Sequence, residues 1–468
     1  MLGRLRHRAT AVFVSLGPGP TLFLGFIALN MLSCAALIGS ILILHARALG
    51  IDAAWVGVLN SLLPFAMMIS MVMTGTAQRL GSKRLLVSGW TMRTILITPI
   101  VFTPLAYRWW GTRGAAVVLF AGVAMFCLVR AVAGIGWSSW LHEIVDEQHR
   151  GLYFTAENVV SRAVGIVFNI LVFGFLLGNP PLWKFSVVSA LGVLTGLVSV
   201  VFLKKVPGGD PVAREPGPPR SPRQEFRRVL ADDYFRPFLL VNVAGSFACA
   251  AVPLVLILFM REHLKLSPGV IMLIYAVAGA VAMCTIHRWT RIADKHGNPV
   301  TMAAAGFMTT GSLCLMGLVG HGRGSSWAIG VLAVLLVVAE SGFFVMCARG
   351  YMHRIIPSMR HSYVAVWSTL NALSAGVSSI LTGLTVRSGS HMAFTLAALG
   401  IAALMAAVCS VLLRLPERGI DFTTPDCELY NPSQPVWSMF RMYGYVLKPM
   451  VNSRPGAVYP PPSDELKH

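Results

Sequence analysis

The chain has 468 residues, of which 55% are apolar and only 12% are charged, and its formal net charge is +19. Soluble domains usually carry about 25% charged residues, so this composition excludes a soluble enzyme and a disordered protein. The eight Cys residues form no C-x-x-C pair, which gives no sign of a disulfide scaffold or a metal site. A polytopic helical membrane protein remains, because runs such as 194–203 lack the alternation of a membrane β-barrel strand.

The chain opens with residues 1–20, which carry Arg4, Arg6 and Arg8 and end in a Gly-Pro-Gly-Pro sequence. No clear small-residue cleavage site follows, so we interpret this segment as a cytoplasmic lead-in rather than a signal peptide.

Apolar spans come next, each close to the ~20 residues that a helix needs to cross ~30 Å of hydrocarbon. Six spans fill residues 21–203, a polar Pro- and Arg-rich loop covers 204–236, six more spans fill 237–413, and a polar tail covers 414–468. The predicted spans are 21–45, 54–76, 85–106, 114–137, 155–177, 183–203, 237–260, 268–287, 298–319, 326–348, 362–385 and 391–413. The tail contains one amphipathic stretch, Pro435–Pro449.

Twelve spans place both termini on the same side of the membrane. The segments on that side hold 27 of the 38 Lys and Arg residues, so the positive-inside rule predicts that both termini are cytoplasmic. The net positive charge therefore reflects topology rather than nucleic-acid binding. Arg outnumbers Lys by 30 to 8, which is typical of a GC-rich genome and favours a bacterial inner membrane. We expect a monomer in the lipid bilayer.

The two groups of six spans repeat one another. The entry to span 2, residues 49–52, matches the entry to span 8, residues 264–267, at an offset of 215. The exit from span 2, residues 78–81, matches the exit from span 8 at an offset of 216. An Arg-x-x-Tyr sequence before span 5, residues 150–153, recurs before span 11 at an offset of 210. Three matches at nearly constant offset predict an internal duplication.

The loops after spans 2 and 8 resemble the G-x-x-x-D-R/K-x-G-R/K-R/K motif of major facilitator superfamily transporters. The residues that carry it are Gln78, Arg79, Gly81, Lys83 and Arg84 in the first copy, and Asp294, Lys295 and Gly297 in the second. The first copy departs from the motif because Gln78 replaces the acid. The resemblance implies an all-α membrane fold of 12 transmembrane helices in two pseudo-symmetric six-helix bundles. It also implies alternating access around a cavity lined chiefly by spans 1, 4, 7 and 10, with contributions from spans 2, 5, 8 and 11.

Both loops are candidate gating elements. Asp294 could accept hydrogen bonds from a helix N-terminus or pair with an Arg, and either contact would hold one face closed. The alternative interpretation is that Arg79, Lys83 and Arg84 only set the topology.

Four ionisable residues lie within spans, where charges are costly and usually face a cavity or a partner. They are Arg93, Arg130, Arg162 and Glu340. Arg130 and Glu340 are repeat mates of opposite charge, so we expect them to face the central cavity and bind each other or the substrate. Glu340 is the candidate protonation site of a proton-coupled cycle. The alternative is a structural ion pair.

The other two basic residues have local interpretations. Arg93 is expected to be structural, either snorkelling or pairing with Glu157. Arg162 could serve as a gate or snorkel to the membrane surface.

Four amides within spans are weaker substrate candidates, because interhelical hydrogen bonds are their commoner role. They are Asn30, Asn169, Asn242 and Asn371. Trp137 and Trp140, at the end of span 4, are interpreted as an interfacial aromatic belt.

We predict a secondary active transporter of a small solute, since no nucleotide-binding or nucleophile motif is present. No catalytic residue and no cofactor is assigned. Two alternatives stay open: a membrane-embedded enzyme, and a non-transporting assembly or receptor protein on the same fold. The enzyme would use a polar cluster after span 4, composed of His142, Glu143, Asp146 and His149.

Overall fold

The computed structural model describes residues 16–72, 81–146, 149–210, 222–319, 325–356, 359–415 and 435–447, and these residues form helices and short connections. Ten of the helical segments are long and apolar enough to cross a membrane. One of them, Ser82–Trp137, has 56 residues and would extend about 84 Å if straight, so it must contain two spans. It turns at Gly111, whose φ of 63° and ψ of −163° are not helical. The 20-residue helix Ala53–Val72 adds one more, which gives twelve spans in the described residues.

The N half contains the first six spans. Its helices are α2 (Pro18–Leu37), α3 (Ser40–Ala48), α4 (Ala53–Val72), α6 (Ser82–Ile97), η1 (Thr98–Phe102), α7 (Thr103–Ala133), α8 (Ile135–Ile144), α9 (Arg150–Phe175) and α10 (Leu182–Lys205). α2 and α3 together form span 1.

The C half contains the other six spans and two surface helices. Its helices are α11 (Pro222–Leu230), α12 (Arg236–Leu258), η3 (Phe259–His263), α13 (Pro268–His296), α14 (Asn298–Met316), α15 (Ser325–Met352), α16 (Arg360–Thr385), α17 (His391–Leu412) and α18 (Pro435–Leu447). α13 continues nine residues beyond the predicted end of its span at residue 287.

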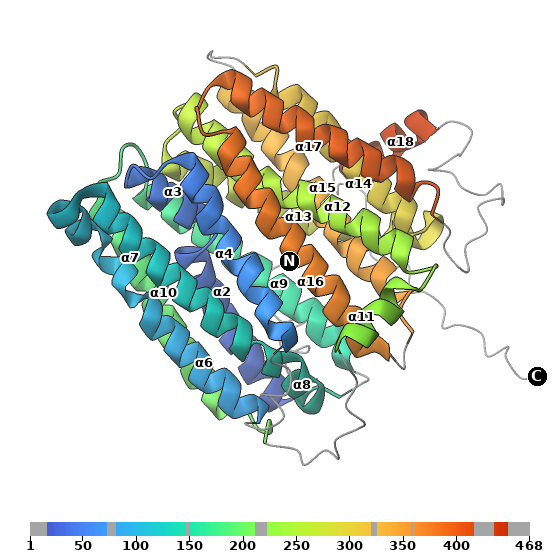
Figure 1. Ribbon diagram of the computed structural model, residues 1–468, viewed down its shortest axis with the longest axis horizontal. Helices are drawn as coiled ribbons and strands as arrows, with labels where there is room; N and C mark the ends of the chain where they lie inside the picture. The colour runs from blue at the N-terminus through green and yellow to red at the C-terminus, as the bar shows by residue number, and fades with distance from the viewer. Residues whose placement is uncertain are drawn as a thin grey trace, which may run out of the picture.

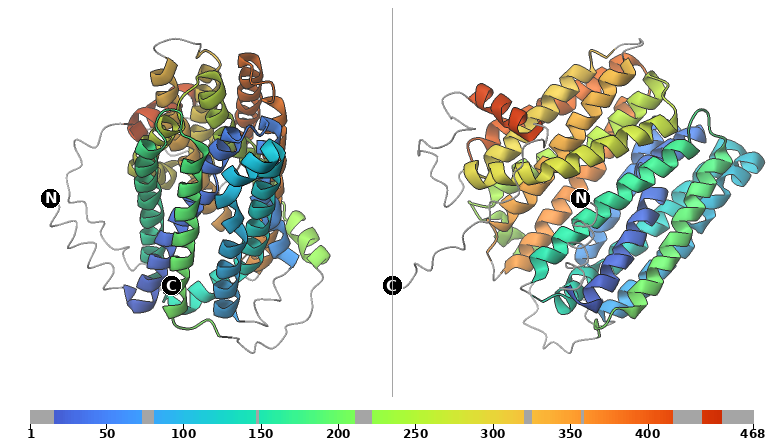
Figure 2. Two further views of the ribbon diagram at one scale, coloured as in Figure 1. Left: turned by 90° about the vertical axis from the view of Figure 1, so that its left-hand side faces the viewer. Right: turned by 180° about the vertical axis from the view of Figure 1, so that it is seen from behind.

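The two halves lie side by side as separate helix bundles (Figures 1 and 2). They meet along two helix pairs, α4 with α16 and α9 with α13. The two pairs are equivalent under the pseudo-twofold symmetry. α4 of the N half corresponds to α13 of the C half, and α9 corresponds to α16. The predicted pair of pseudo-symmetric bundles is confirmed.

The helix ends define two faces of the molecule. We call the end where α3 meets α4, around residue 52, the Asp52 face, and the opposite end, where α8 meets α9, the Glu143 face. Figure 1 shows α3 at one end of the bundle and α8 and α11 at the other.

The duplication is visible in the backbone of the two turns on the Asp52 face. Gly50 has a φ of 78° and its repeat mate Lys265 has a φ of 55°, so both turns use the left-handed conformation. The next helix is capped in the same way in each half. Asp52 Oδ1 accepts a hydrogen bond from the Ala54 N–H at 2.8 Å, and the Ser267 hydroxyl accepts one from Val270 at 3.3 Å. Two sequences that share few side chains therefore form the same turn.

The loops after spans 2 and 8 also end alike. Gly81 has a φ of 79° and Gly297 a φ of 86°, and each is the residue before the next helix. Only glycine adopts this conformation without strain, which explains why both copies of the motif place a glycine there.

The interpretation of Trp137 and Trp140 as an interfacial belt is wrong. Trp140 is fully buried, and its indole N–H donates to the Pro207 carbonyl at 2.9 Å. Trp137 stacks on Trp90 with ring centroids 6.4 Å apart, and Phe23 contacts both Trp137 and Trp140. These rings form an aromatic core between α2, α6 and α8, so the two Trp side chains pack inside the protein.

The amphipathic stretch of the tail forms α18, which packs against α13 and α14. Met442 and Val446 are fully buried, and the Tyr443 hydroxyl donates to the Ala304 carbonyl at 2.8 Å. Arg288 donates hydrogen bonds to the carbonyls of Tyr445 and Val446, so these two carbonyl groups at the end of α18 have a partner.

Candidate functional site

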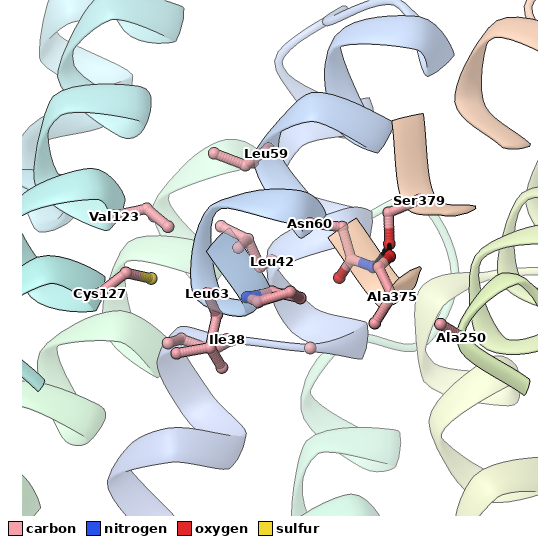
Figure 3. Close-up of a pocket in the computed structure, with 12 residues that line it drawn as sticks. Ile38, Leu42, Leu59, Asn60, Leu63, Val123, Cys127, Ala250, Ala375 and Ser379 are labelled. Atoms are coloured by element: carbon pink, nitrogen blue, oxygen red, sulfur yellow. Dashed lines mark hydrogen bonds between the residues drawn. The ribbon is translucent and has the colours of Figure 1, made fainter. Parts of the chain in front are cut away.

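A cavity of about 280 Å³ lies where the two halves meet (Figure 3). It receives residues from spans 1, 2, 4, 7 and 11, and its lining is mostly apolar. The lining residues are Ile38, Gly39, Leu42, Leu59, Asn60, Leu63, Pro64, Val123, Cys127, Ala250, Ala375 and Ser379. Spans 1, 4 and 7 are three of the four that the family resemblance implied as chief cavity helices.

Span 1 is broken at this cavity. α2 ends where Ile38 takes an extended conformation, and α3 begins after Gly39, which has a φ of 77°. No side chain caps the N-terminus of α3, so its first N–H groups have no side-chain partner. Irregular backbone within a membrane is tolerated where it lines a cavity or is buried in protein, and both broken residues line this one.

One polar contact crosses the cavity wall from half to half. The Asn60 amide on α4 donates to the Ser379 hydroxyl on α16 at 3.1 Å, as the dashed line in Figure 3 shows. These are the two polar side chains of the lining, so they are available to a solute in the cavity.

An ion pair joins the halves on the Asp52 face. Arg47 Nε lies 2.7 Å from Glu262 Oε1, and both side chains are mostly buried, with exposed fractions of 24% and 12%. Positions 47 and 262 differ by 215, which is the repeat offset of this region. The pair therefore lies on the pseudo-twofold axis, and the two mates carry opposite charges.

A second, more exposed pair lies nearby. Arg387 Nε lies 3.4 Å from Asp52 Oδ2, with exposed side-chain fractions of 67% and 39%. It connects the end of α16 to the start of α4.

Glycines permit the closest approach of the halves. A methyl group at Gly57 on α4 would lie 2.5 Å from the Ser379 carbonyl oxygen and 3.0 Å from Gly383 Cα. On the symmetric interface, a methyl group at Gly269 on α13 would lie 2.4 Å from the Phe173 carbonyl oxygen. The Gly269 N–H also donates to the Leu176 carbonyl at 3.0 Å. Both interfaces thus require glycine at these positions, because a methyl group would clash with the backbone of the other half.

Three side-chain contacts join the halves on the Asp52 side of the molecule: Arg47 with Glu262, Arg387 with Asp52, and Asn60 with Ser379. Two contacts at the Glu143 face each lie within one half. Lys83 donates to the Val206 carbonyl at 2.6 Å in the N half, and Arg349 pairs with Asp294 at 2.7 Å in the C half. The contacts of Arg47, Asp52 and Asn60 with the other half thus all lie toward the Asp52 face.

The N half contains a buried cation at mid-depth. Arg93 is fully buried, and its guanidinium lies 4.3 Å from the ring centroid of Trp90 and 4.8 Å from that of Phe126. Its Nη2 donates to the Asn30 carbonyl oxygen, which also accepts from the Trp90 indole at 3.0 Å. Its Nε and Nη1 are buried without a hydrogen-bond partner, at a typical cost of about 1–3 kcal/mol for each such group. The expected alternative pairing with Glu157 is not formed.

Arg130 and Glu340 do not pair in this structure, since no ion pair joins them among the described residues and neither lines the cavity. Both are partly buried. Arg130 lies near Arg93, close enough for the two positive charges to repel each other. Glu340 lies near Tyr275 and Cys249, within the C half. Each mate is thus in its own bundle.

The other candidates are distributed between both halves. Arg162 and Asn169 are partly buried on α9. Asn242 is buried and its amide donates to the Cys347 sulfur. The Asn371 carbonyl accepts from Ser246 at 2.5 Å and its amide donates to the Trp367 carbonyl at 2.7 Å. Asn30 binds Arg93 and Trp90, so three of the four amides serve as hydrogen-bond partners of neighbouring side chains.

The two motif loops have different partners. Gln78 and Arg79 lie outside the described residues. In the first copy, Lys83 binds the Val206 carbonyl and Arg84 is exposed.

In the second copy, Asp294 pairs with Arg349 of α15, which is one of the two contacts expected for it. Lys295 is exposed and follows the acid directly. This ion pair connects α13 to α15, and its role in gating remains a prediction.

One residue of the polar cluster that the alternative enzyme would use, Glu143, has a structural role. Both carboxylate oxygens of Glu143 accept from the Gly209 N–H at 3.0 Å, which ties the end of span 4 to the end of span 6. Among the residues that the structure describes, no three His, Cys, Asp or Glu side chains gather as a metal site would require.

Two contacts between the halves were missed by the sequence reasoning. Asn60 is an amide within span 2 and could have been included with the other four. Arg47 and Glu262 lie at mated positions with opposite charge, as Arg130 and Glu340 do, so the repeat offset could have revealed them.

Comparisons with known proteins agree with this architecture. The family model of the Major Facilitator Superfamily matches residues 21–346 and again residues 238–453. Searching curated proteins returns no match to the chain. Among solved structures, a mutant of the nucleoside transporter NupG is similar with a TM-score of 0.65 at 13% identity, covering 84% of this chain and 99% of that one.

Two other solved transporters share the fold. A POT family transporter in complex with 5-aminolevulinic acid has a TM-score of 0.63 at 14% identity, covering 85% of this chain and 95% of that one. The D-xylose-proton symporter has a TM-score of 0.61 at 11% identity, covering 85% and 98%. At these identities the likeness shows the fold.

Proposed function

The chain belongs to the Major Facilitator Superfamily, and from that premise we propose that it moves a small solute across a membrane by alternating access. The family consists of secondary transporters, so the chain is a transporter and not a membrane-embedded enzyme. The energy for transport then comes from a gradient.

The observation that carries the proposal is a cavity at the boundary of two repeated bundles, with named polar contacts between the bundles on one side of it. Polar contacts between the halves lie on the Asp52 side of the cavity, through Arg47 and Glu262 and through Asn60 and Ser379. Rocking of the bundles would break these contacts and form others at the Glu143 face, which would expose the cavity to each side in turn.

The distribution of Lys and Arg supports an orientation with both termini in the cytoplasm, and the excess of Arg supports a bacterial inner membrane. With this orientation the Glu143 face is cytoplasmic, and the contacts on the Asp52 face support a state closed to the outside. A single copy of the chain contains both bundles and the cavity, which supports transport by a monomer.

We also propose that Glu340 couples transport to protons. It is partly buried in the membrane interior, no arginine pairs with it among the described residues, and Tyr275 lies close to it. A carboxyl group in such a place changes its charge with little competition from a fixed ion pair. The D-xylose-proton symporter and the POT family transporter share the fold with this chain.

The experiment is uptake into proteoliposomes that contain the purified chain, measured with and without an inward pH gradient, across a panel of labelled sugars, nucleosides, peptides and organic acids. We expect Glu340→Gln to abolish gradient-driven uptake and to spare exchange of internal for external solute. Glu157→Gln, another partly buried carboxyl on α9, is the matched control and should keep both activities. Normal gradient-driven uptake by Glu340→Gln would remove the coupling role, and absence of any flux would remove the proposed function.

A further inference from the structure

The buried cation Arg93 lacks a negative partner. Its Nε and Nη1 have no hydrogen-bond partner, and no ion pair among the described residues includes it. Trp90 and Phe126 surround its flat faces, and the Cys34 thiol lies beside it. An arginine stays protonated under all ordinary conditions, so this position holds a full positive charge away from water.

A second cation, Arg130 on the cavity helix α7, lies near Arg93 and has no ion pair among the described residues. Val123, Cys127 and Arg130 follow one another on α7 at intervals of four and three residues, so they lie on one face of the helix. Val123 and Cys127 line the cavity, and Figure 3 shows both side chains directed into it. Arg130 is therefore the next residue along the cavity-facing side of α7, one turn toward the Glu143 face.

Two adjacent positive charges without an acid repel each other, and the repulsion is stronger within a membrane protein than in water. The same place contains unused guanidinium N–H groups, which prefer carboxylate and phosphate oxygens. An anionic group would relieve the repulsion and use these donors. The adjoining cavity is apolar except for Asn60 and Ser379, and its volume suits the body of a small organic molecule.

We infer that the solute is a small amphipathic organic anion, whose apolar part occupies the cavity and whose negative group binds Arg130 and Arg93. This inference rests on the proposed function and names the substrate class of the same site. The structure supports an anionic oxygen group in general, which a carboxylate or a phosphonate could supply. Inorganic phosphate has the charge without the apolar part.

The test is isothermal titration of the purified full-length chain with benzoate, phenylphosphonate, inorganic phosphate and benzamide. Benzamide is the neutral counterpart of benzoate and has nearly the same shape. We expect benzoate or phenylphosphonate to bind, with benzamide and inorganic phosphate at least tenfold weaker. Of the two organic anions, the tighter one identifies the anionic group.

Variants place the binding at the two arginines. Arg130→Gln and Arg93→Gln should each weaken anion binding at least tenfold, and Arg93→Lys should retain part of it. Arg130 is only partly buried, so its variant folds even where loss of Arg93 destabilises the aromatic core. Arg113→Gln, an exposed arginine beyond the turn at Gly111, is the matched control and should bind as the wild type does.

Three results would overturn the inference: benzamide binding as tightly as benzoate, anion binding unchanged in both Gln variants, or no binding of either organic anion. Uptake of labelled benzoate and of a neutral sugar into proteoliposomes separates this inference from the proposed function. Flux of the sugar that persists in Arg130→Gln contradicts the inference and upholds the transporter. If benzoate binding depends on the arginines but no solute is transported, the proposed transport function is contradicted. The assignment of an anion-binding site to the arginines then still holds.

Discussion

The N half and the C half share a backbone and differ in charge. Where the chain must turn, the mates behave alike: Gly50 and Lys265 are both left-handed, and Gly81 and Gly297 both precede a helix with positive φ. In the membrane interior they diverge. The N half contains the buried Arg93 and the partly buried Arg130, neither of which pairs with an acid among the described residues, whereas Glu340 of the C half lies near neutral side chains.

This difference separates two kinds of constraint. Turns, caps and glycine contacts recur because each bundle must fold in the same way. The charges of Arg130 and Glu340 do not recur, which is the result expected of a protein with one binding site in place of two copies of it. The pair Arg47 and Glu262 shows both constraints at once, since equivalent positions have opposite charges and meet on the symmetry axis.

The largest expected effect tests whether the two interfaces are equivalent. Gly57→Ala and Gly269→Ala each place a methyl group about 2.5 Å from a carbonyl oxygen of the other half. Overpacking of this kind costs roughly 1–3 kcal/mol, so the closed state should lose roughly five- to 150-fold in population. We expect longer pulsed-EPR distances between spin labels at Arg113 and Ser388, which are exposed on the Asp52 face in opposite halves.

The matched control is Gly165→Ala on α9, where a methyl group meets nothing within 4 Å. Its label distance should equal that of the parent. If Gly57→Ala opens the face and Gly269→Ala does not, the two interfaces are unequal and the symmetric description of closure fails.

A comparable effect is expected from the ion pair on the axis. Arg47→Ala or Glu262→Ala removes a mostly buried charged contact, worth about 1.5–3 kcal/mol, and should lower the closed population at least tenfold. The exchanged variant, Arg47→Glu with Glu262→Arg, should restore closure because the two positions are symmetry mates. The same EPR distance measures each variant.

The exposed pair of Asp52 and Arg387 provides the internal comparison. Its contact is longer and more hydrated, so Arg387→Gln should change closure by less than about 1 kcal/mol. An exchanged variant that stays as open as the single variants would show that the geometry at positions 47 and 262 is not symmetric.

Much of the fold could be predicted from the sequence, because membrane spans follow from hydrophobicity alone and the repeat follows from turn residues. The spans agree with the helices to within a few residues except at α13, whose end is amphipathic and continues to His296. The aromatic residues Trp137 and Trp140 were misplaced because their contact with Trp90 and Phe23 is tertiary, and hydropathy does not report which way a helix end bends.

The candidate site was harder to predict, since ionisable residues can be found in a sequence but their partners cannot. Arg130 and Glu340 were expected to face the central cavity and to bind each other or the substrate, but no ion pair joins them among the described residues. The break in span 1 at Ile38 and Gly39 was not predicted, because an apolar sequence continues through it and only the backbone reveals the change. Asn60 and Ser379 meet across an interface that no local pattern encodes.

The smallest effect tests the shared backbone itself, through folding stability and not through closure. A non-glycine residue pays about 1 kcal/mol for a left-handed conformation, so Lys265→Gly should stabilise the chain and Gly50→Ala should destabilise it by a similar amount. Thermal unfolding in one detergent measures both. Lys265→Gln keeps the Cβ and removes the charge near Glu262, so it separates strain from electrostatics. If Lys265→Gln stabilises as much as Lys265→Gly, the gain comes from charge, and the two turns are alike in shape without being alike in energy.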